Sequence, residues 1–168
     1  SNVYYVGHSM GGYIGLELLA NYEELLDGLV LLNSHCYTDS KEKSTNRSKT
    51  INFLERRGSE IYINEIYKTL FGLNYLENHK EQIETLKQNA KKYPVETLIH
   101  NCRAMISRRD HSNTIVKSTV PIHCLLGDRD ALIPIEDYND MLTLNTNIQV
   151  FELLENCGHM GMYESEYE

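Results

Sequence analysis

The stretch Val3-Tyr4-Tyr5-Val6-Gly7-His8-Ser9-Met10-Gly11-Gly12 decides the fold. Its first four residues are apolar, β-branched or aromatic, which is typical of a strand buried on both faces of a parallel sheet. Ile14, Leu18 and Leu19 then recur at spacings that predict a helix. A second apolar run, Leu29-Val30-Leu31-Leu32, predicts another strand. Strand, helix and strand in succession indicate an α/β protein.

Within this stretch, Gly7-His8-Ser9-Met10-Gly11 fits the pattern G-x-S-x-G, which places a serine on a tight turn between a strand and a helix. We expect Ser9 to have a strained backbone, and we expect a side chain at either glycine to collide with the turn. The following helix would offer backbone N–H groups and a partial positive charge where an oxyanion forms. The pattern arises by chance in roughly one chain in twenty of this length. Its position between a strand and a helix is therefore what gives it weight.

A serine hydroxyl needs a general base, and that base needs a group to orient it. The sequence offers both residue types after predicted strands. Asp130 follows the apolar run 121–126, and His159 lies in Cys157-Gly158-His159, after the run 148–153. The carboxyl ends of parallel strands share one edge of a sheet, so we expect Ser9, Asp130 and His159 to converge there. The order Ser, Asp, His is the one that α/β hydrolases use.

Between the two α/β stretches lies a polar, helix-patterned segment from Cys36 to about Arg109. Its periodicity predicts four helices, with a break at Pro94. Their expected ranges are 45–57, 59–71, 78–93 and 95–108. We interpret the segment as a helical cap inserted into the α/β unit.

Three segments together resemble the α/β-hydrolase superfamily, in its capped, esterase-like branch of serine hydrolases. They are Val6 to Gly12, Gly127-Asp128-Arg129-Asp130-Ala131-Leu132-Ile133-Pro134, and Cys157-Gly158-His159-Met160. The similarity extends over essentially the whole chain. It implies an α/β-hydrolase fold, a parallel sheet flanked by helices, with the core formed by residues 1–37 and 116–168 and the helical cap by residues 38–115.

The resemblance also implies roles for individual residues. Ser9 is the expected nucleophile, His159 the base and Asp130 the acid that orients it, while the backbone N–H of Met10 supplies one oxyanion donor. Asp128 is the alternative acid, although the spacing of the family favours Asp130. The expected reaction is cleavage of a carboxylic ester or related acyl substrate through an acyl-enzyme, without a cofactor.

The sequence departs from the family pattern at its start. The family's sheet has eight strands, whereas this chain begins at the strand that corresponds to the fifth. The first four strands, and the loop that donates the second oxyanion N–H, have no counterpart. We therefore expect the sequence to be part of a longer hydrolase, with Val3 to Val6 at an exposed apolar edge.

Composition excludes several other classes of function. Sixteen Lys and Arg face 24 Asp and Glu, a net charge of −8, which disfavours nucleic acid as a partner. No apolar run approaches the roughly 20 residues of a membrane span. Seven histidines without ligand spacing give no metal site, and four well-separated cysteines (Cys36, Cys102, Cys124 and Cys157) favour free thiols and a cytoplasmic location. A small ester or acyl compound is the expected partner, and the oligomeric state stays open.

Several alternatives remain at this point. The same triad serves thioesterases, amidases, carbon–carbon bond hydrolases and cofactor-free haloperoxidases. A catalytically inert, hydrolase-like binding module or fragment is the alternative from a different class. Serine rather than aspartate at position 9 disfavours a dehalogenase or epoxide hydrolase.

Overall fold

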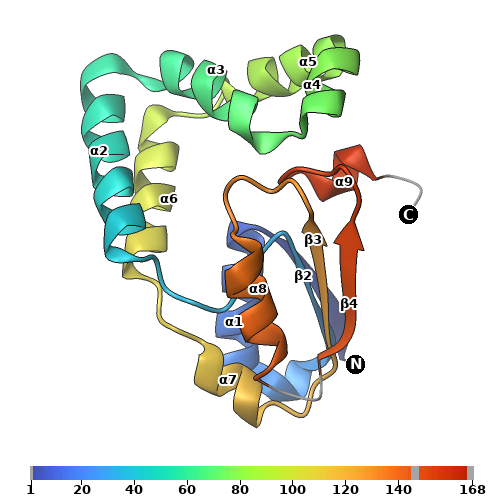
Figure 1. The fold of residues 1–168 in the computed structure, drawn as a ribbon. Coiled ribbons are helices and arrows are strands. Elements are labelled where there is room, and N and C mark those ends of the chain that lie inside the picture. Colours follow the sequence, from blue (N-terminus) through green and yellow to red (C-terminus); the bar gives the residue numbers. More distant parts are fainter. Residues whose placement is uncertain (1, 145–147, 166–168) are drawn as a thin grey trace.

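The computed structural model describes residues 2–144 and 148–165 and contains a four-stranded parallel sheet (Figure 1). The strands are β1 (Val3–His8), β2 (Leu26–Leu32), β3 (Ile122–Gly127) and β4 (Ile148–Leu154), and they lie in the order β1-β2-β3-β4. Each strand pairs in parallel with the next. The α/β class predicted from the sequence is therefore confirmed, as are all four predicted strands, each of which ends one or two residues later than expected except β2.

One face of the sheet packs against helices α1 (Met10–Tyr22), α7 (Ser112–Lys117) and α8 (Ile135–Leu142), as Figure 1 shows. The main hydrophobic core lies between this face and the helices. It includes Leu29 and Leu31 of β2, Ile122 and Cys124 of β3, and Ile115 of α7, all fully buried. Alternate residues of the strands supply this core because successive side chains point to opposite faces of a sheet.

The opposite face of β1 is exposed. Tyr4 and Val6 are 76% and 65% exposed, whereas Tyr5 between them packs in the core. The expectation of an exposed apolar edge at Val3 to Val6 is therefore confirmed, whereas burial on both faces, which is typical of such a run, is not observed. An apolar run without alternation resembles a fully buried strand, but here only one of its faces meets helices.

Five helices connect β2 to α7, and we call them the helical layer (residues 41–107). They are α2 (Lys41–Arg57), α3 (Ser59–Leu70), α4 (Leu73–Asn78), α5 (Lys80–Ala90) and α6 (Val95–Ser107). Two expectations were wrong here. Helix α2 begins four residues earlier than predicted because the Ser40 hydroxyl accepts a hydrogen bond from Lys43 N, at 3.1 Å, and caps it. The helix predicted over 78–93 is α5, which is shorter at both ends, and α4 before it was not predicted; His79, whose backbone is not helical, separates the two.

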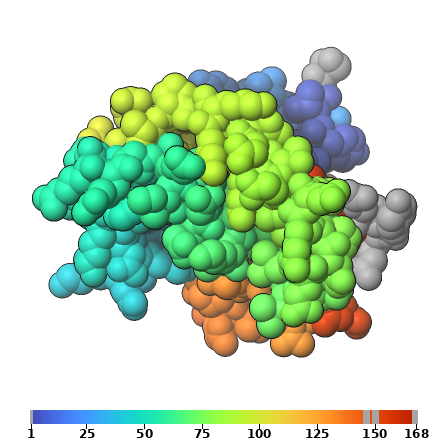
Figure 2. Space-filling view, turned by 90° about the horizontal axis from the view of Figure 1, so that it is seen from above, coloured from blue at the N-terminus to red at the C-terminus, as the bar shows by residue number. Residues whose placement is uncertain are grey.

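The helical layer lies above the carboxyl ends of the strands (Figure 1), and in the view from above it covers most of that side (Figure 2). A second, smaller hydrophobic cluster of Phe71, Tyr75 and Ile83 holds α3, α4 and α5 together. Met160 and Tyr163, which follow β4, pack against this cluster, so the layer is joined to the end of the sheet.

Three observations bear on the other sequence expectations. All four cysteines are buried and free, as predicted. In the part of the chain that the structure describes, no helix has the length and apolar character that a membrane span requires. The division into a core of 1–37 and 116–168 and a cap of 38–115 stays a prediction, and Ile115 at its boundary packs in the main core.

Candidate active site

Ser9 occupies the turn between β1 and α1, at φ 49° and ψ −115°. This positive φ is strained for a residue with a side chain. Two backbone hydrogen bonds hold the turn in place: Ser9 N donates to Leu32 O of the neighbouring strand at 3.0 Å, and Gly12 N donates to Ser9 O at 2.9 Å. The hydroxyl of Ser34 also donates to Ser9 O, at 2.9 Å. The serine is thus fixed at the end of a strand, and Met10 is the first residue of the helix beyond it.

The two glycines of the motif differ in what they require. A Cβ at Gly7 would lie 2.5 Å from the backbone of Gly11, a distance that real atoms do not adopt. A Cβ at Gly11 would meet nothing within 4 Å, so the expectation of a collision there was wrong. The close approach belongs instead to Gly12, where a Cβ would lie 2.2 Å from Ser34 Oγ. The turn therefore needs its glycines at positions 7 and 12.

Asp130 and His159 form a buried pair. Asp130 Oδ2 and His159 Nδ1 lie 2.8 Å apart, and their side chains are 1% and 3% exposed. Leu132 N and Ile133 N donate to Asp130 Oδ1 at 2.8 and 3.1 Å, which fixes the carboxylate. Burial alone would raise the pKa of Asp130, but the hydrogen bond and charge of His159 outweigh it, and the pKa lies below its usual value.

Asp128, the alternative acid, has different partners. Its Oδ1 accepts a hydrogen bond from Cys157 N at 3.1 Å, and its Oδ2 lies 3.6 Å from Arg129 Nε. Asp128 therefore shapes the loop that carries His159, whereas Asp130 contacts the imidazole itself.

Asn33 belongs to the site although the sequence analysis did not single it out. It follows β2, is fully buried and has φ 46°. Its amide donates to Asp130 Oδ2 at 2.9 Å and to Gly158 O at 3.1 Å. Asn33 thus holds both the acid and the histidine loop. A polar residue after a central strand was the available signal, because that edge of a parallel sheet carries ligand sites.

Glu164 is a second residue that the sequence did not indicate. Its Oε1 accepts hydrogen bonds from Gly158 N and Met160 N at 3.0 and 3.2 Å, on either side of His159. Its Oε2 accepts from Gly72 N, between α3 and α4, at 2.7 Å. His159 N also donates to Leu70 O at 2.8 Å. The histidine loop is therefore attached directly to the helical layer.

Ser9 and His159 line one cavity of about 520 Å³ beneath the helical layer. Because His159 Nδ1 faces Asp130, its Nε2 is the nitrogen left for the cavity. His8 lies beside the pair: its Nε2 is 2.7 Å from His159 O, and the two rings are 5.0 Å apart. Burial lowers the pKa of His8, which keeps it neutral at neutral pH.

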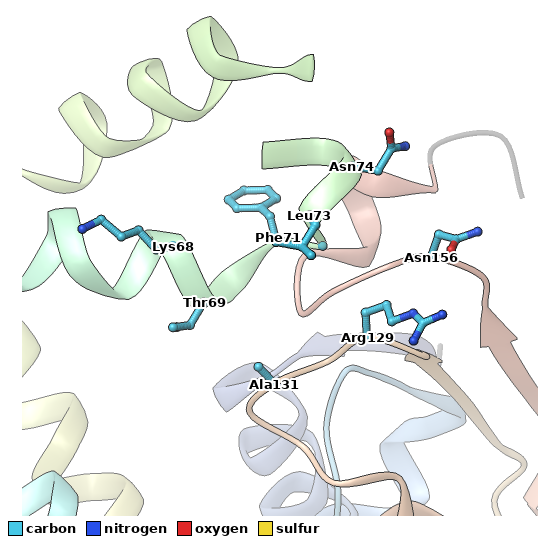
Figure 3. Close-up of a pocket in the computed structure, with 9 residues that line it drawn as sticks. Lys68, Thr69, Phe71, Leu73, Asn74, Arg129, Ala131 and Asn156 are labelled. Carbon is cyan, nitrogen blue, oxygen red and sulfur yellow. The ribbon is translucent and has the colours of Figure 1, made fainter. Parts of the chain in front are cut away.

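A separate cavity of about 590 Å³ lies between the α3–α4 junction and the loops after β3 and β4 (Figure 3). Lys68, Phe71 and Leu73 line it from the helical layer, and Arg129 and Asn156 from the loops. It shares Ala131 with the first cavity but includes neither Ser9 nor His159. Among the residues that the structure describes, no group of three or more His, Cys, Asp or Glu is arranged to hold a metal ion.

Comparison with known families agrees with this geometry. The family described as "Serine aminopeptidase, S33" matches residues 1–166. The chain belongs to this family. It is thereby a member of the α/β-hydrolase superfamily, and the expected fold is confirmed.

The individual relatives are named as different kinds of hydrolase. The chain is 25% identical over 98% of its length to the "Putative carbamate hydrolase RutD" of Serratia proteamaculans, of which it covers 61%. A thermophilic esterase from Thermogutta terrifontis is 26% identical over 98% of this chain, with a TM-score of 0.89 and 60% of that chain covered. An esterase from Exiguobacterium antarcticum shares the fold at 20% identity, covering 99% of this chain and 62% of its own, with a TM-score of 0.84. The present chain thus spans about 60% of the length of these relatives.

Proposed function

We propose that the protein is a serine hydrolase that cleaves a carboxylic ester or related acyl substrate. Ser9 attacks the acyl carbon, and His159 Nε2 takes the proton of its hydroxyl. Asp130 holds the imidazole in the required tautomer and stabilises the imidazolium that forms. The leaving group takes the proton from His159. His159 then takes a proton from water, whose oxygen attacks the acyl carbon, and Ser9 Oγ leaves with that proton as the acid product is released.

The 2.8 Å contact between Asp130 and His159, with Ser9 on the same cavity, carries this proposal. A buried carboxylate beside a histidine that lines the same cavity as a strained serine is consistent with the arrangement that activates a hydroxyl. The partial positive charge at the start of α1 would stabilise the oxyanion, with the N–H of Met10 as one donor.

The class of acyl bond is the finer part of the proposal. The esterase from Thermogutta terrifontis supports an ester, whereas the names of the S33 family and of RutD favour an amide or a carbamate. We favour the ester, because an alkoxide is a far better leaving group than an amide anion, so an amide depends more strongly on full protonation of its nitrogen by His159. We further propose that residues 38–115 act as a cap over the cavity and that the protein works in the cytoplasm.

Hydrolysis of three matched compounds tests the proposal on the whole protein. These are 4-nitrophenyl butyrate, butyryl-4-nitroanilide and 4-nitrophenyl dimethylcarbamate, assayed with wild type and Ser9→Ala. We expect turnover of the ester at about 1 to 1000 per second, slower cleavage of the other two, and loss of all three activities in the variant. Ester turnover that persists in Ser9→Ala would overturn the role of Ser9, and faster cleavage of the anilide would overturn the preference for esters.

A further inference from the structure

Helix α2 presents one polar stripe to the cavity that contains Ser9. Lys43, Asn46, Arg47 and Thr50 all line this cavity, and they lie at positions i, i+3, i+4 and i+7 of the helix. Residues at these spacings share one helical face. The proposed triad does not use this face. Two of its residues, Lys43 and Arg47, are nevertheless cationic in a chain whose net charge is −8.

Asp39, the carboxylate beside Arg47, is already paired with two guanidinium groups. Asp39 Oδ2 lies 2.5 Å from Arg47 Nε, and Asp39 Oδ1 lies 2.8 Å from Arg108 Nη1. The Asp39 side chain is 1% exposed, so it neutralises one of two guanidiniums and leaves one positive charge in excess. Burial would raise the pKa of Asp39, but hydrogen bonds from Arg47 and Arg108 outweigh it and keep the pKa below its usual value.

Arg108 contributes to the same wall from behind. Its side chain is 7% exposed, and its guanidinium lies 4.2 Å from the centre of the Tyr13 ring, which lines the cavity. Its Nη2 is buried and has no hydrogen-bond partner among the described residues. Arg108 does not itself line the cavity, so its charge adds to the positive potential behind Tyr13 and Asp39, both of which do line it.

Of Lys43, Arg47 and Arg108, Lys43 makes the weakest contact within the protein. Among the described residues its ion pair joins Nζ to Asp137 Oδ2 at 3.6 Å, with both side chains more than a third exposed. Such a pair contributes little. Lys43 is therefore free to turn toward a bound anion without breaking a buried contact.

The remaining walls of the cavity are largely apolar. Ile66 and Leu70 line it from α3, Leu132 and Ile133 from the loop after β3, and Met160 from the histidine loop. A short hydrocarbon chain would pack against these side chains while a charged end meets α2. The cavity thus matches a molecule with one apolar part and one anionic group.

We propose that helix α2 selects substrates that carry a carboxylate in addition to the scissile acyl bond, with Lys43 and Arg47 as the residues that determine this specificity. This inference rests on the proposed function, because it assigns the substrate class of the same site. Carboxylates recognised by Lys and Arg form charge-assisted hydrogen bonds, which are stronger than neutral ones.

A matched pair of esters tests the inference. 4-Nitrophenyl hydrogen glutarate and 4-nitrophenyl valerate have the same chain length and leaving group and differ in the terminal carboxylate. We expect kcat/KM to favour the glutarate at least tenfold, and we expect 0.5 M NaCl to reduce that preference by screening. Lys43→Gln should lower kcat/KM for the glutarate about three- to tenfold and leave the valerate unchanged. Lys49→Gln, an exposed position of the same helix, is the control and should change neither.

A substitution that is expected to increase the preference for the glutarate ester adds a second test. Asp137→Asn removes the partner of Lys43 and should increase the preference for the glutarate ester by about two- to threefold. A second pair, 4-acetoxybenzoate and phenyl acetate, places the carboxylate on the leaving group instead. A preference for the first of these two compounds assigns the anion subsite to the alcohol side of the bond, and a preference only in the glutarate pair assigns it to the acyl side.

Binding separates this inference from the proposed function. In the Ser9→Ala background, ligand-observed NMR should show tighter binding of methyl hydrogen glutarate than of methyl valerate, and Lys43→Gln should remove the difference. Absent hydrolysis with this binding preference intact would reject the proposed function but support the anion subsite. Equal binding and equal kcat/KM for both members of the pairs, unaffected by Lys43→Gln, would overturn the inference.

Discussion

In the sheet core, the charged groups of the site are held by the backbone. Asp130 accepts from two backbone N–H groups and from Asn33, and its side chain is 1% exposed. In the helical layer, Lys43 and Arg47 reach the cavity as long side chains that are 34% and 27% exposed. The core therefore fixes geometry, which the proposed proton transfers require, whereas the layer offers adjustable charge. The comparison separates the proposed catalytic residues, which the core holds, from the proposed carboxylate-binding residues, which lie in the helical layer.

The largest effect is expected in the core, at Asp130. Asp130→Asn preserves shape but favours the wrong tautomer of His159, so ester turnover should fall by about 10⁴-fold. Asp128→Asn is the matched control, because Asp128 contacts the backbone of Cys157 and should lower turnover less than tenfold. Steady-state kinetics of both variants checks this, and a larger loss at Asp128 would exchange their roles.

A pair of glycine substitutions tests how rigidly the core holds its turn. Gly7→Ala places a methyl group 2.5 Å from the backbone of Gly11, and we expect it to lower the free energy of unfolding by about 3 kcal/mol or more. Gly11→Ala meets no neighbour and lies in a helix, so it should be neutral or stabilising by up to about 1 kcal/mol. Urea unfolding of the two variants measures the contrast, which equal losses would refute.

Glu164 joins the two regions and gives a smaller effect. Glu164→Ala removes three hydrogen bonds that tie the His159 loop to Gly72 of the helical layer, and misplacement of His159 should lower kcat by roughly 10- to 100-fold. Because the residue positions His159 and lies outside the substrate-binding face of α2, KM should change little. Glu164→Gln keeps the length of the side chain and one acceptor oxygen, so it should retain more of kcat than Glu164→Ala.

The exposed Glu155, from the same loop, provides the control for Glu164. Glu155→Ala should leave kcat within about twofold, as surface substitutions usually do. An increase in KM with kcat unchanged for Glu164→Ala would show that the link to the helical layer does not act through His159. An equal decrease in kcat for both glutamate variants would show the same.

The smallest effect concerns pH, at His35 between the two regions. Burial, with the charges of Lys43 and Arg108, lowers the pKa of His35 to about 3. In the unfolded chain it is about 6.5. The unfolded state therefore binds a proton that the folded state does not, and the stability contributed by neutral His35 is lost as pH falls below about 6.5.

Unfolding by urea at pH 7 and pH 4.5 measures this contribution. His35→Asn retains an acceptor for Tyr37 N, which donates to His35 Nδ1 at 3.1 Å. The wild type should lose more of its free energy of unfolding between the two pH values than the variant. Equal losses would show that His35 is protonated in the folded protein.

The sequence predicted those features that depend on local chemistry. The strand-turn-helix pattern around Ser9 and the loops that hold Asp130 and His159 each lie within a few residues, so their spacing is visible in the chain. Asn33 and Glu164 could not be found in this way, because their partners come from the loop after β3, the histidine loop and the α3–α4 junction. Helix α4 escaped prediction because its six residues are too few for helical periodicity to show. The exposed edge at β1 was expected from the resemblance alone, because an apolar run does not itself reveal which of its faces is covered.

The central claim is that Ser9 is a nucleophile activated by His159. A fluorophosphonate probe, followed by mass spectrometry of the digested whole protein, tests it most directly. The account predicts one adduct, on the peptide that contains Ser9, abolished by Ser9→Ala and formed at least 100-fold more slowly by His159→Gln. Labelling that survives Ser9→Ala, or that proceeds at the same rate without His159, would contradict it.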